Sequence, residues 1–328
     1  MNFKSLRVYL EPTLRIAVET VDETILPDHE VLIEVHYSSL NYKDALSANG
    51  NKGVSKNYPH TPGIDVAGIV KDSKSDAWKP GDRVIVTGYD LGMNTYGGFS
   101  QYVRVPSDWI VSCPDSLELR DAMCYGTAGF TAALSVEKIV NNITPDAGEI
   151  LVTGATGGVG TVAIAILSKL GYSVAAATGK ATSAAFLQSI GAKTIVSREE
   201  TNDQTGKALL RSRWAGVIDT VGGNILSTAI KTTQYLGHIT CCGNVSSPEF
   251  SSSIYPFILK GVTLHGIDSV ACPKEHRFKI WEYLSTDWAI PGLYQAVHEV
   301  TLDEVPEQLD LMIKGKHQGR TIVNLKNS

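Results

Sequence analysis

One stretch decides the fold: Gly148-Glu149-Ile150-Leu151-Val152-Thr153-Gly154-Ala155-Thr156-Gly157-Gly158-Val159-Gly160-Thr161-Val162-Ala163-Ile164-Ala165-Ile166-Leu167. The apolar run from Ile150 to Thr153 predicts a short buried strand. Glycines follow the strand at once, and small and aliphatic residues that suit a helix follow the glycines. The order strand, glycine turn and helix is typical of a domain that binds a dinucleotide.

The glycines of this turn suit contact with a phosphate group. A phosphate needs unpaired backbone N–H donors with no side chain in the way, and the first turn of a helix provides them together with the positive end of its dipole. The spacing Ala155-x-Gly157-x-x-Gly160 is a variant of the dinucleotide fingerprint. The alternative is a tight turn without a ligand. A nucleoside triphosphate loop is excluded, because Thr161 follows Gly160 where that loop requires Lys.

Strands and helices alternate after the first third of the chain. We expect four strand–helix units and one further strand, which together predict a doubly wound parallel sheet of the Rossmann type. The units are 150–153 with 158–170, 173–177 with 182–190, 194–196 with 203–212, and 216–220 with 224–234, followed by the strand 238–242.

The first part of the chain has a different pattern. Short strands are expected at 31–37, 63–70, 83–86 and 96–103, with Gly and Pro between them. Close spacing of this kind predicts an antiparallel, barrel-like domain. Helices are expected at 274–284 and 303–314 and a strand at 320–325, which we expect to return to the first domain. The predicted domains are 1–123, 124–265 and 266–328, the last returning in part to the first.

Length, charge and cysteines narrow the class of protein. A chain of 328 residues exceeds one core, so two domains are expected. With 29 Lys and Arg against 34 Asp and Glu, the net charge of −5 points to neither nucleic acid nor a membrane surface. No signal-like or membrane-spanning run is present in the sequence, so a cytoplasmic protein is expected. The five cysteines form no C-x-x-C pair, and buried free thiols are expected, including Cys241 and Cys242.

The end of the second strand of the predicted sheet indicates the coenzyme. An NAD site has an acidic residue there for the ribose hydroxyls. This chain has Thr178, Gly179 and Lys180 instead, and Arg198 follows the third strand. A hydroxyl, an open backbone and two cations suit a 2′-phosphate, so we expect NADPH. The alternative is that Lys180 and Arg198 are ordinary solvated charges.

Several segments together resemble a known family. The chain is similar to the medium-chain dehydrogenase/reductase superfamily, to its zinc-free quinone-oxidoreductase-like branch, and most to the subfamily of NADPH-dependent acrylyl-CoA reductases. That resemblance implies a GroES-like barrel beside the Rossmann-type domain. The segments that carry it are 38–46, 62–68, 126–132, 152–160, 218–222, 256–259, 266–270 and 318–321.

The zinc-dependent relatives have a Cys ligand near Asn41 and a Gly-His-Glu motif. Here the motif reads Gly63-Ile64-Asp65, and no Cys occurs before Cys113. The ligands of a catalytic zinc are therefore absent from these positions, and no metal is expected. The remaining chemistry is hydride transfer to a carbon that is already electrophilic, such as the β-carbon of an α,β-unsaturated thioester or ketone.

The resemblance also implies roles for single residues. Asn41 would donate an amide N–H to the substrate or nicotinamide, or cap a helix that begins at Tyr42; Asp65 would be a polar active-site group, or a partner for Lys43 or Arg83. The cofactor would be contacted by Tyr42, Thr156, Gly157, Gly158, Val159, Thr178, Gly179, Lys180, Arg198, Leu264 and Arg320. Relatives often have Ser-Gly-Arg where this chain has Thr178-Gly179-Lys180. Cys242 could act as a thiol or lie in the core.

Three functions are kept open. The first is an NADPH-dependent reductase of acrylyl-CoA or a similar short enoyl thioester, and the second is a quinone or enone reductase with the same hydride chemistry. The third is a non-catalytic NADPH sensor that acts on a partner protein. The expected partner is a small-molecule substrate, and relatives commonly form homodimers through the run from Pro256 to Val270.

Overall fold

The structure is a computed structural model that describes residues 1–292 and 297–326, apart from the side chain of residue 181. The chain divides into two compact units. Unit 1 contains residues 1–127, 269–286 and the described residues from 297 onward. Unit 2 contains residues 128–268 and 287–292. The predicted boundaries at residues 123 and 265 stay predictions, because contacts within a chain do not show where independently folding domains end.

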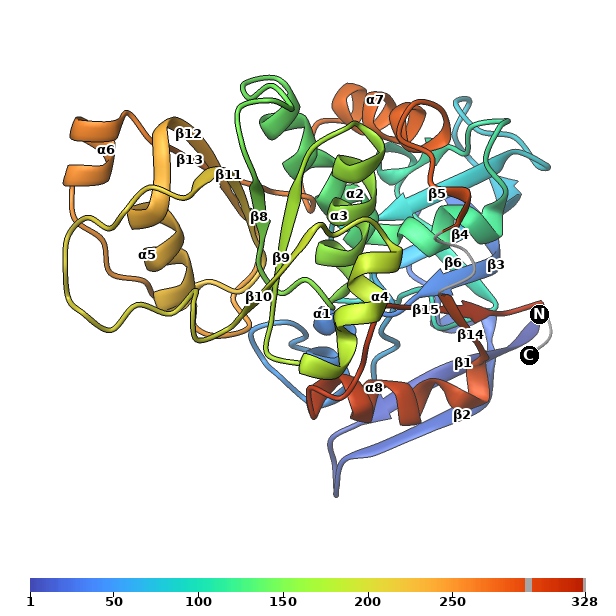
Figure 1. The fold of residues 1–328 in the computed structure, drawn as a ribbon. Coiled ribbons are helices and arrows are strands. Elements are labelled where there is room, and N and C mark those ends of the chain that lie inside the picture. Colours follow the sequence, from blue (N-terminus) through green and yellow to red (C-terminus); the bar gives the residue numbers. More distant parts are fainter. Residues whose placement is uncertain (293–296, 327–328) are drawn as a thin grey trace. The chain divides into compact units, whose positions relative to one another are not determined.

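Unit 2 is built on a six-stranded parallel sheet with the strand order β10-β9-β8-β11-β12-β13 (Figure 1). The doubly wound parallel sheet expected from the sequence is confirmed. Its strands are β8 (Ile150–Val152), β9 (Val174–Thr178), β10 (Thr194–Ser197), β11 (Trp214–Asp219), β12 (Thr233–Cys241) and β13 (Thr263–Gly266). Its helices are α3 (Gly158–Lys169), α4 (Ala184–Ser189), α5 (Gly223–Thr232) and α6 (Tyr255–Lys260).

The prediction of a helix at 203–212 is wrong. No helix lies between β10 and β11, and this crossover is irregular. Several of its backbone groups bond to α5: Asp203 donates to the Thr228 hydroxyl, and Leu210 and Arg213 donate to carbonyls at the end of α5. The ammonium group of Lys260 also donates to the Leu210 carbonyl, at 3.4 Å. Polar contacts with neighbouring elements therefore replace the internal hydrogen bonds of a helix.

Unit 1 contains a seven-stranded path, β14-β15-β3-β4-β5-β7 with β6 paired to β3, and a separate β1–β2 hairpin. The pairs within this path are antiparallel apart from β14 and β15, which run parallel. The strands are β1 (Asn2–Tyr9), β2 (Arg15–Asp22), β3 (Val31–Ser39), β4 (Asp65–Ser73), β5 (Arg83–Thr87), β6 (Tyr102–Val105), β7 (Val111–Ser112), β14 (Val297–Thr301) and β15 (Arg320–Asn324). The return of the tail to the first sheet is confirmed by the pairing of β15 with β3.

The strand expected at 96–103 is regular only from Tyr102. Gly97 and Gly98 before it lie against the backbone near Gly63, closer than a side chain would allow. A methyl group at Gly98 would lie 2.2 Å from the Asp65 carbonyl. Close packing of two backbones therefore replaces strand pairing in this segment.

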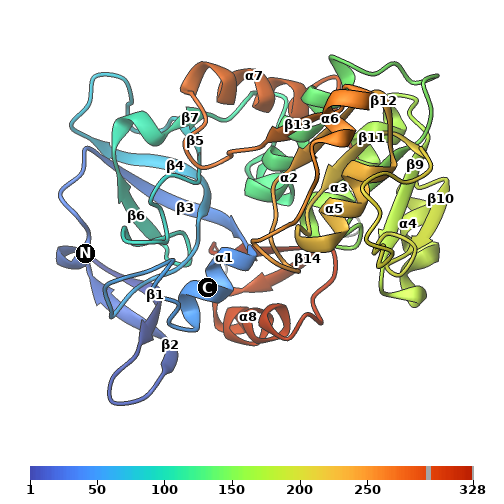
Figure 2. The ribbon, with the colours of Figure 1, turned by 90° about the vertical axis from the view of Figure 1, so that its left-hand side faces the viewer.

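The helices of unit 1 are α1 (Tyr42–Ala48), α7 (Lys274–Ser285) and α8 (Val305–Ile313), and α1 and α8 lie side by side (Figure 2). Helix α2 (Leu119–Val140) begins in unit 1 and ends in unit 2, with non-helical angles at Gly126. Each unit has an apolar core, one of which includes Val66 and Phe99 and the other Leu151 and Trp214.

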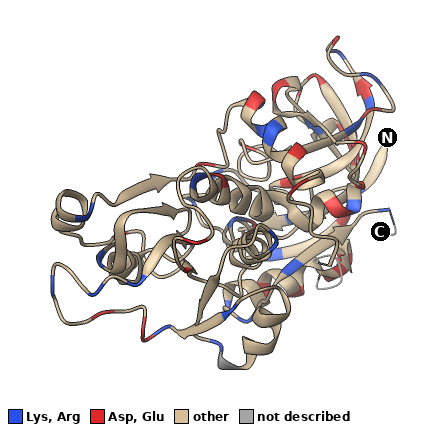
Figure 3. Ribbon diagram, turned by 45° about the horizontal axis from the view of Figure 1, so that its top comes forward, with Lys and Arg blue, Asp and Glu red and all other residues tan. Residues whose placement is uncertain are grey.

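Acidic and basic residues are interspersed along the ribbon and do not form long runs of one sign (Figure 3). Among the described residues, no helix is long and apolar enough to span a bilayer. Short 3₁₀ turns complete the structure at Glu23–Ile25, Ser107–Trp109, Ala181–Ser183 and Leu302–Glu304.

Candidate active site

A buried polar cluster forms around Asp65 in unit 1. Strand β4 begins at Asp65, whose side chain is fully buried. Its Oδ2 accepts from the Ser39 hydroxyl at 2.5 Å, the Asn41 amide at 2.7 Å and the Thr127 backbone N–H at 2.9 Å, and its Oδ1 accepts from the Thr127 hydroxyl at 2.5 Å. We call Ser39, Asn41, Asp65, Thr127 and Arg320 the Asp65 cluster. Four donors hold the carboxylate in one orientation.

Asn41 has its amide oriented by this carboxylate. Because a carboxylate only accepts, the amide nitrogen must face Asp65. The same nitrogen donates to the Ser39 carbonyl at 3.3 Å, so both of its hydrogens have acceptors. The atom that can still accept a hydrogen bond is Oδ1. Asn41 also occupies the N-cap of α1, and its backbone N–H donates to the Asp44 carboxyl at 2.8 Å.

Arg320 completes the cluster from strand β15. Its guanidinium is buried and donates to the carbonyls of Leu40, Met123 and Cys124 and to the Ser39 hydroxyl. Burial lowers the pKa of Arg320, and the charge of Asp65 opposes that shift. The guanidinium is thus held by protein groups from two separate parts of the sequence, 39–40 and 123–124.

Gly126 covers the cluster with bare backbone. Its φ of 53° lies in the region that favours glycine. A methyl group there would lie 2.3 Å from the Ser39 hydroxyl, 2.6 Å from the Asp65 carboxylate and 2.7 Å from the Arg320 guanidinium. The lack of space for a side chain and the positive φ both require glycine at this position.

Asp44 is a second buried carboxyl beside the cluster. It accepts from the backbone N–H groups of Gly63 and Ile64, at 3.1 and 2.9 Å. Burial and the negative charge of Asp65 raise the pKa of Asp44 to about 7. The negative charge of Asp65 therefore opposes ionisation of Asp44.

The alternative that Asp65 forms an ion pair with Lys43 or Arg83 is wrong. The carboxylate bonds to the cluster and not to Lys43 or Arg83. The guanidinium of Arg83 bonds to the Leu117 carbonyl and lies 3.8 Å from Glu118. Tyr42 begins α1 with a side chain that is 42% exposed, so its ring can contact a ligand.

The glycine turn in unit 2 has the geometry of a phosphate site. Gly157 is exposed and is the N-cap of α3, which begins at Gly158. The first N–H groups of a helix have no acceptor within it and can bind an anion. A methyl group at Gly160 would lie 2.6 Å from the Gly154 carbonyl, so this glycine lets the helix pack directly on the turn. Thr156 is buried and Val159 half-buried in the same turn.

Arg198 lies directly over Gly179. A methyl group on Gly179 would be 2.8 Å from the guanidinium carbon of Arg198, although the two residues follow different strands. The register of β9 and β10, with Thr178 opposite Ser197, brings them together. The Thr178 hydroxyl accepts from the Lys180 backbone N–H at 3.0 Å. We call Thr178, Gly179, Lys180 and Arg198 the arginine cradle, in which Gly179 and Arg198 are exposed.

Asp219 and Cys242 of unit 2 bond to groups of the protein itself. The buried Asp219 accepts from the Thr153 hydroxyl at 2.7 Å and the Gly222 N–H at 2.8 Å, which fixes the ends of β8 and β11. Cys242 donates to the Asp219 carbonyl, and burial raises its pKa to about 12. This thiol stays protonated at neutral pH, which argues against a thiolate role. Cys241 and Cys242 are half-buried, so the burial expected for these two thiols is wrong, whereas Cys113, Cys124 and Cys272 are buried. Leu264 lies on β13 and packs against the apolar core.

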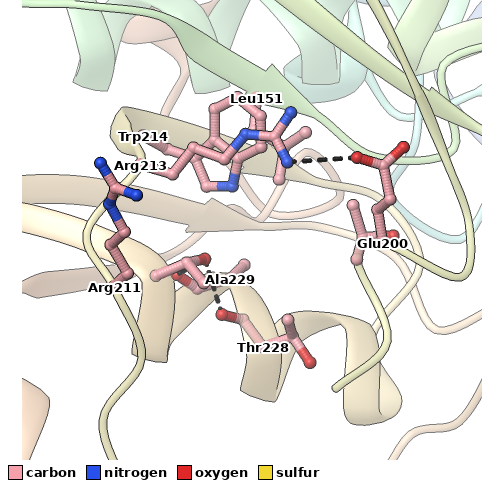
Figure 4. Close-up of a pocket in the computed structure, with 9 residues that line it drawn as sticks. Leu151, Glu200, Arg211, Arg213, Trp214, Thr228 and Ala229 are labelled. Atoms are coloured by element: carbon pink, nitrogen blue, oxygen red, sulfur yellow. Dashed lines mark hydrogen bonds and ion pairs between the residues drawn. The ribbon is translucent and has the colours of Figure 1, made fainter.

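A small pocket lies under the β10–β11 crossover (Figure 4). Leu151, Trp214 and Ala229 form its apolar part. Arg213 extends over the Trp214 ring toward Glu200, with its guanidinium carbon 4.2 Å from the ring centroid and an ion pair of 3.4 Å to the carboxylate. The pocket adjoins the turn that carries Arg198.

Among the described residues, no group of three or more His, Cys, Asp or Glu could hold a metal ion. Ile64 is buried, and its backbone N–H is bound by Asp44. The segment that would supply zinc ligands in the zinc-dependent relatives therefore forms hydrogen bonds within the protein.

Sequence reasoning missed Ser39 and Thr127 as members of this site. Ser39 precedes Asn41 in the segment 38–46, and Thr127 follows Gly126 in the segment 126–132, both of which carry the resemblance. The available signal was a hydroxyl side chain in each of these two segments. Their convergence on one carboxylate depends on the packing of β3, β4 and the start of α2.

Models of known families match most of the chain. The alcohol dehydrogenase GroES-like domain matches residues 27–115, and the zinc-binding dehydrogenase model matches residues 158–284. These matches fall on unit 1 and, for the most part, on unit 2. The GroES-like character expected for the first domain is confirmed.

Individual proteins are similar along nearly the whole chain. The acrylyl-CoA reductase AcuI of Ruegeria pomeroyi is 42% identical over 310 residues, 94% of each chain. The yhdH oxidoreductase of Salmonella enterica, solved in complex with NADP, is 39% identical with a TM-score of 0.95, covering 99% of this chain and 100% of that one. The Bacillus subtilis protein yhfP, solved with NAD bound, is 43% identical with the same TM-score and coverage. Relatives of similar closeness thus bind phosphorylated and unphosphorylated coenzymes.

Proposed function

The chain belongs to the zinc-free, quinone-oxidoreductase-like branch of the medium-chain dehydrogenases/reductases, and on that premise we propose that it reduces an α,β-unsaturated acceptor with NADPH. The acceptor we propose is acrylyl-CoA or a similar short enoyl thioester. The observation that carries this choice is the likeness to the acrylyl-CoA reductase along nearly the full length of both chains.

The residues of unit 2 fit NADPH. Thr156, Gly157, Gly158 and Val159 would hold the pyrophosphate with backbone N–H groups, as the start of α3 allows. The arginine cradle would hold the 2′-phosphate, since it offers two cations and a hydroxyl where an NAD site has an acid. Contacts of Tyr42 and Leu264 with the cofactor belong to the same proposal. Arg320, which the resemblance also implied as a contact, is 3% exposed and bonded to protein groups, so its proposed role is to hold Ser39 of the Asp65 cluster and not to touch the coenzyme.

When bound, NADPH supplies the hydride that adds to the β-carbon of the acceptor. The role of Asn41 in this scheme is to accept a hydrogen bond at Oδ1, because its amide hydrogens are bound to Asp65 and Ser39. Such an acceptor suits the carboxamide N–H of a nicotinamide. Asp65 acts as a positioning residue: its buried carboxylate holds the amide in one orientation, and four donors surround it.

An acceptor panel tests the proposal. Purified protein dialysed against a chelator is mixed with NADPH and acrylyl-CoA, crotonyl-CoA, an enone or a quinone, and absorbance at the nicotinamide band is followed. Fast oxidation with acrylyl-CoA is expected. Turnover only with quinones or enones would reassign the protein to the second candidate function. NADPH binding without any turnover would favour a sensor, and inactivity until zinc is restored would contradict the metal-free route.

We also propose a homodimer through the open edge of the unit 2 sheet. β13 is the last strand of that sheet, and large apolar side chains near it are exposed: Tyr235, Leu236, Ile254, Ile258 and Leu259, each by more than half. An exposed apolar group beside an unpaired strand is typical of a protein interface. Light scattering should give twice the chain mass, and Ile258→Glu should give the mass of one chain; a monomeric wild type would contradict this proposal.

A further inference from the structure

We propose that Glu200 is a positioning residue for coenzyme selection: its carboxylate fixes the turn that presents Arg198 to the 2′-phosphate. This inference rests on the proposed role of the arginine cradle. It concerns a residue that touches no coenzyme itself, on the irregular crossover after β10. Selectivity matters in this family, because relatives of similar closeness were solved with NADP and with NAD.

The turn from Ser197 to Thr201 is closed by reciprocal hydrogen bonds. The Ser197 backbone N–H donates to Glu200 Oε1 at 3.1 Å, and the Glu200 backbone N–H donates to the Ser197 hydroxyl at 3.2 Å. Inside this loop, the Arg198 carbonyl accepts from both the backbone N–H and the hydroxyl of Thr201, at 3.2 and 2.9 Å. The backbone on both sides of Arg198 is therefore held by hydrogen bonds, which fixes the point from which its side chain extends over Gly179.

The other carboxylate oxygen connects this turn to the core. Glu200 Oε2 pairs with the Arg213 guanidinium at 3.4 Å, and that guanidinium lies on the ring of Trp214, which is 2% exposed (Figure 4). Arg213 is itself fixed by its backbone, whose N–H donates to Thr232 and whose carbonyl accepts from Gln234. The two oxygens of one carboxylate thus link the turn of Arg198 to the start of β11.

The charge of Glu200 makes the inference testable. An acid close to a phosphate site repels the ligand, so on charge alone its removal should tighten NADPH binding. Arg213 offsets this charge, which lets the carboxylate orient the turn with little net repulsion. If Glu200 acts by holding the turn that carries Arg198, its removal should instead weaken NADPH binding and leave NADH binding unchanged. The two accounts predict opposite signs.

The experiment measures the dissociation constants of NADPH and NADH by fluorescence titration, which needs no acceptor. For Glu200→Ala we expect the NADPH constant to rise by roughly threefold to tenfold and the NADH constant to stay within about twofold, as for the loss of an orienting contact. Glu200→Gln keeps an oxygen for the Ser197 N–H and should retain most of the NADPH affinity. Glu199→Gln, an exposed neighbour, serves as the matched control for charge.

The double variant Glu200→Ala/Arg213→Met removes one charge of each sign, so the net charge beside the cradle does not change. The positioning account predicts the same loss of NADPH affinity as for Glu200→Ala alone, because both break the same link. Tighter or unchanged NADPH binding in Glu200→Ala, or equal weakening of both coenzymes, would overturn the inference. Thermal unfolding of each variant shows that it is folded.

Arg198→Ala separates this inference from the proposal beneath it. We expect this variant to weaken NADPH at least about tenfold and NADH little, as for the loss of a charged contact to phosphate. No effect of Arg198→Ala would overturn both the assignment of the cradle and the role of Glu200. An effect of Arg198→Ala without one of Glu200→Ala would overturn only the inference about Glu200.

Discussion

The Asp65 cluster and the arginine cradle are both groups of polar side chains, but they differ in how their hydrogen bonds are used. In the Asp65 cluster the carboxylate and the guanidinium are buried, and each bonds to several protein groups. In the arginine cradle the guanidinium of Arg198 is exposed and lies on bare backbone at Gly179. A satisfied buried cluster fixes structure, whereas an exposed cation over open backbone is suited to bind a ligand. We therefore expect changes in the first to alter stability more than coenzyme affinity, and changes in the second to alter coenzyme affinity more than stability.

The largest expected effect is that of Gly126→Ala. The new methyl group would meet three polar atoms of the Asp65 cluster, and the backbone has a positive φ. Overpacking and strain together should lower the free energy of unfolding by about 2–5 kcal/mol. Urea unfolding measures this loss. Gly81→Ala is the control, because its φ is also positive but nothing lies within 4 Å, so a loss of only about 1 kcal/mol is expected. Equal losses in both variants would show that the contacts at Gly126 contribute nothing.

The second-largest loss of unfolding free energy is expected for Asp65→Asn. The amide NH₂ of asparagine would face N–H and O–H donors of Ser39, Asn41 and Thr127, which need an acceptor. The substitution also removes the negative charge beside Arg320. We expect a loss of about 2–4 kcal/mol in unfolding free energy and a fall in kcat. The NADPH dissociation constant should rise less than in Arg198→Ala, because only the proposed hydrogen bond of Asn41 to the nicotinamide is disturbed. Calorimetry and coenzyme titration on the same preparation measure both. A variant of normal stability with weakened NADPH binding would reverse the comparison between the two regions.

The pH dependence of stability tests Asp44. Its pKa in the folded protein is raised to about 7, above the usual value of 3.8. Between these values the folded chain holds a proton that the unfolded chain releases, so the stability due to this group falls as pH rises from about 4 to 7. Asp44→Asn lacks this dependence, and the variant should gain on the wild type by up to about 4 kcal/mol across the window.

The measurement is the unfolding free energy of both proteins at several pH values. Asp76→Asn, an exposed carboxyl of the same unit, should follow the wild-type curve. Parallel curves for the wild type and Asp44→Asn would show that Asp44 is ionised in the folded protein throughout this range.

The smallest expected effect is a gain in the arginine cradle. Lys180→Arg would restore the two-pronged donor that relatives often have at this position, and a guanidinium matches phosphate geometry better than an ammonium. We expect the NADPH dissociation constant to fall by about twofold to fivefold, with NADH and the unfolding free energy unchanged. Weaker NADPH binding, or an equal gain for NADH, would show that Lys180 does not face the 2′-phosphate.

Local sequence patterns predicted the strands and helices well where apolar periodicity was strong. The strand from Ile150, the glycine turn and the helix from Gly158 form as expected, since each depends on neighbours in the sequence. The helix expected at 203–212 failed because its backbone bonds to α5 and its charged groups to distant residues, which periodicity does not record. The β1–β2 hairpin was also missed.

The site residues likewise divide into those that the local sequence predicts and those that depend on the assembled fold. The arginine cradle was predictable, because strand ends in a parallel sheet meet at one edge and the residues there could be read directly. The Asp65 cluster was only partly predictable: Asn41 and Asp65 were singled out, whereas Thr127 and Ser39 became evident only once β3, β4 and α2 were assembled. The orientation of the Asn41 amide depends on that assembly, and it changes the expected donor into an acceptor.

The most direct test of the proposed reaction follows the hydrogen itself. Chelator-treated protein is given acrylyl-CoA and NADPH labelled with deuterium at the transferable position of C4, and the product is examined by mass spectrometry and NMR. Our account predicts propionyl-CoA with one deuterium on the β-carbon and a solvent proton on the α-carbon. Deuterium on the α-carbon, or no labelled product from any enoyl thioester, would contradict it.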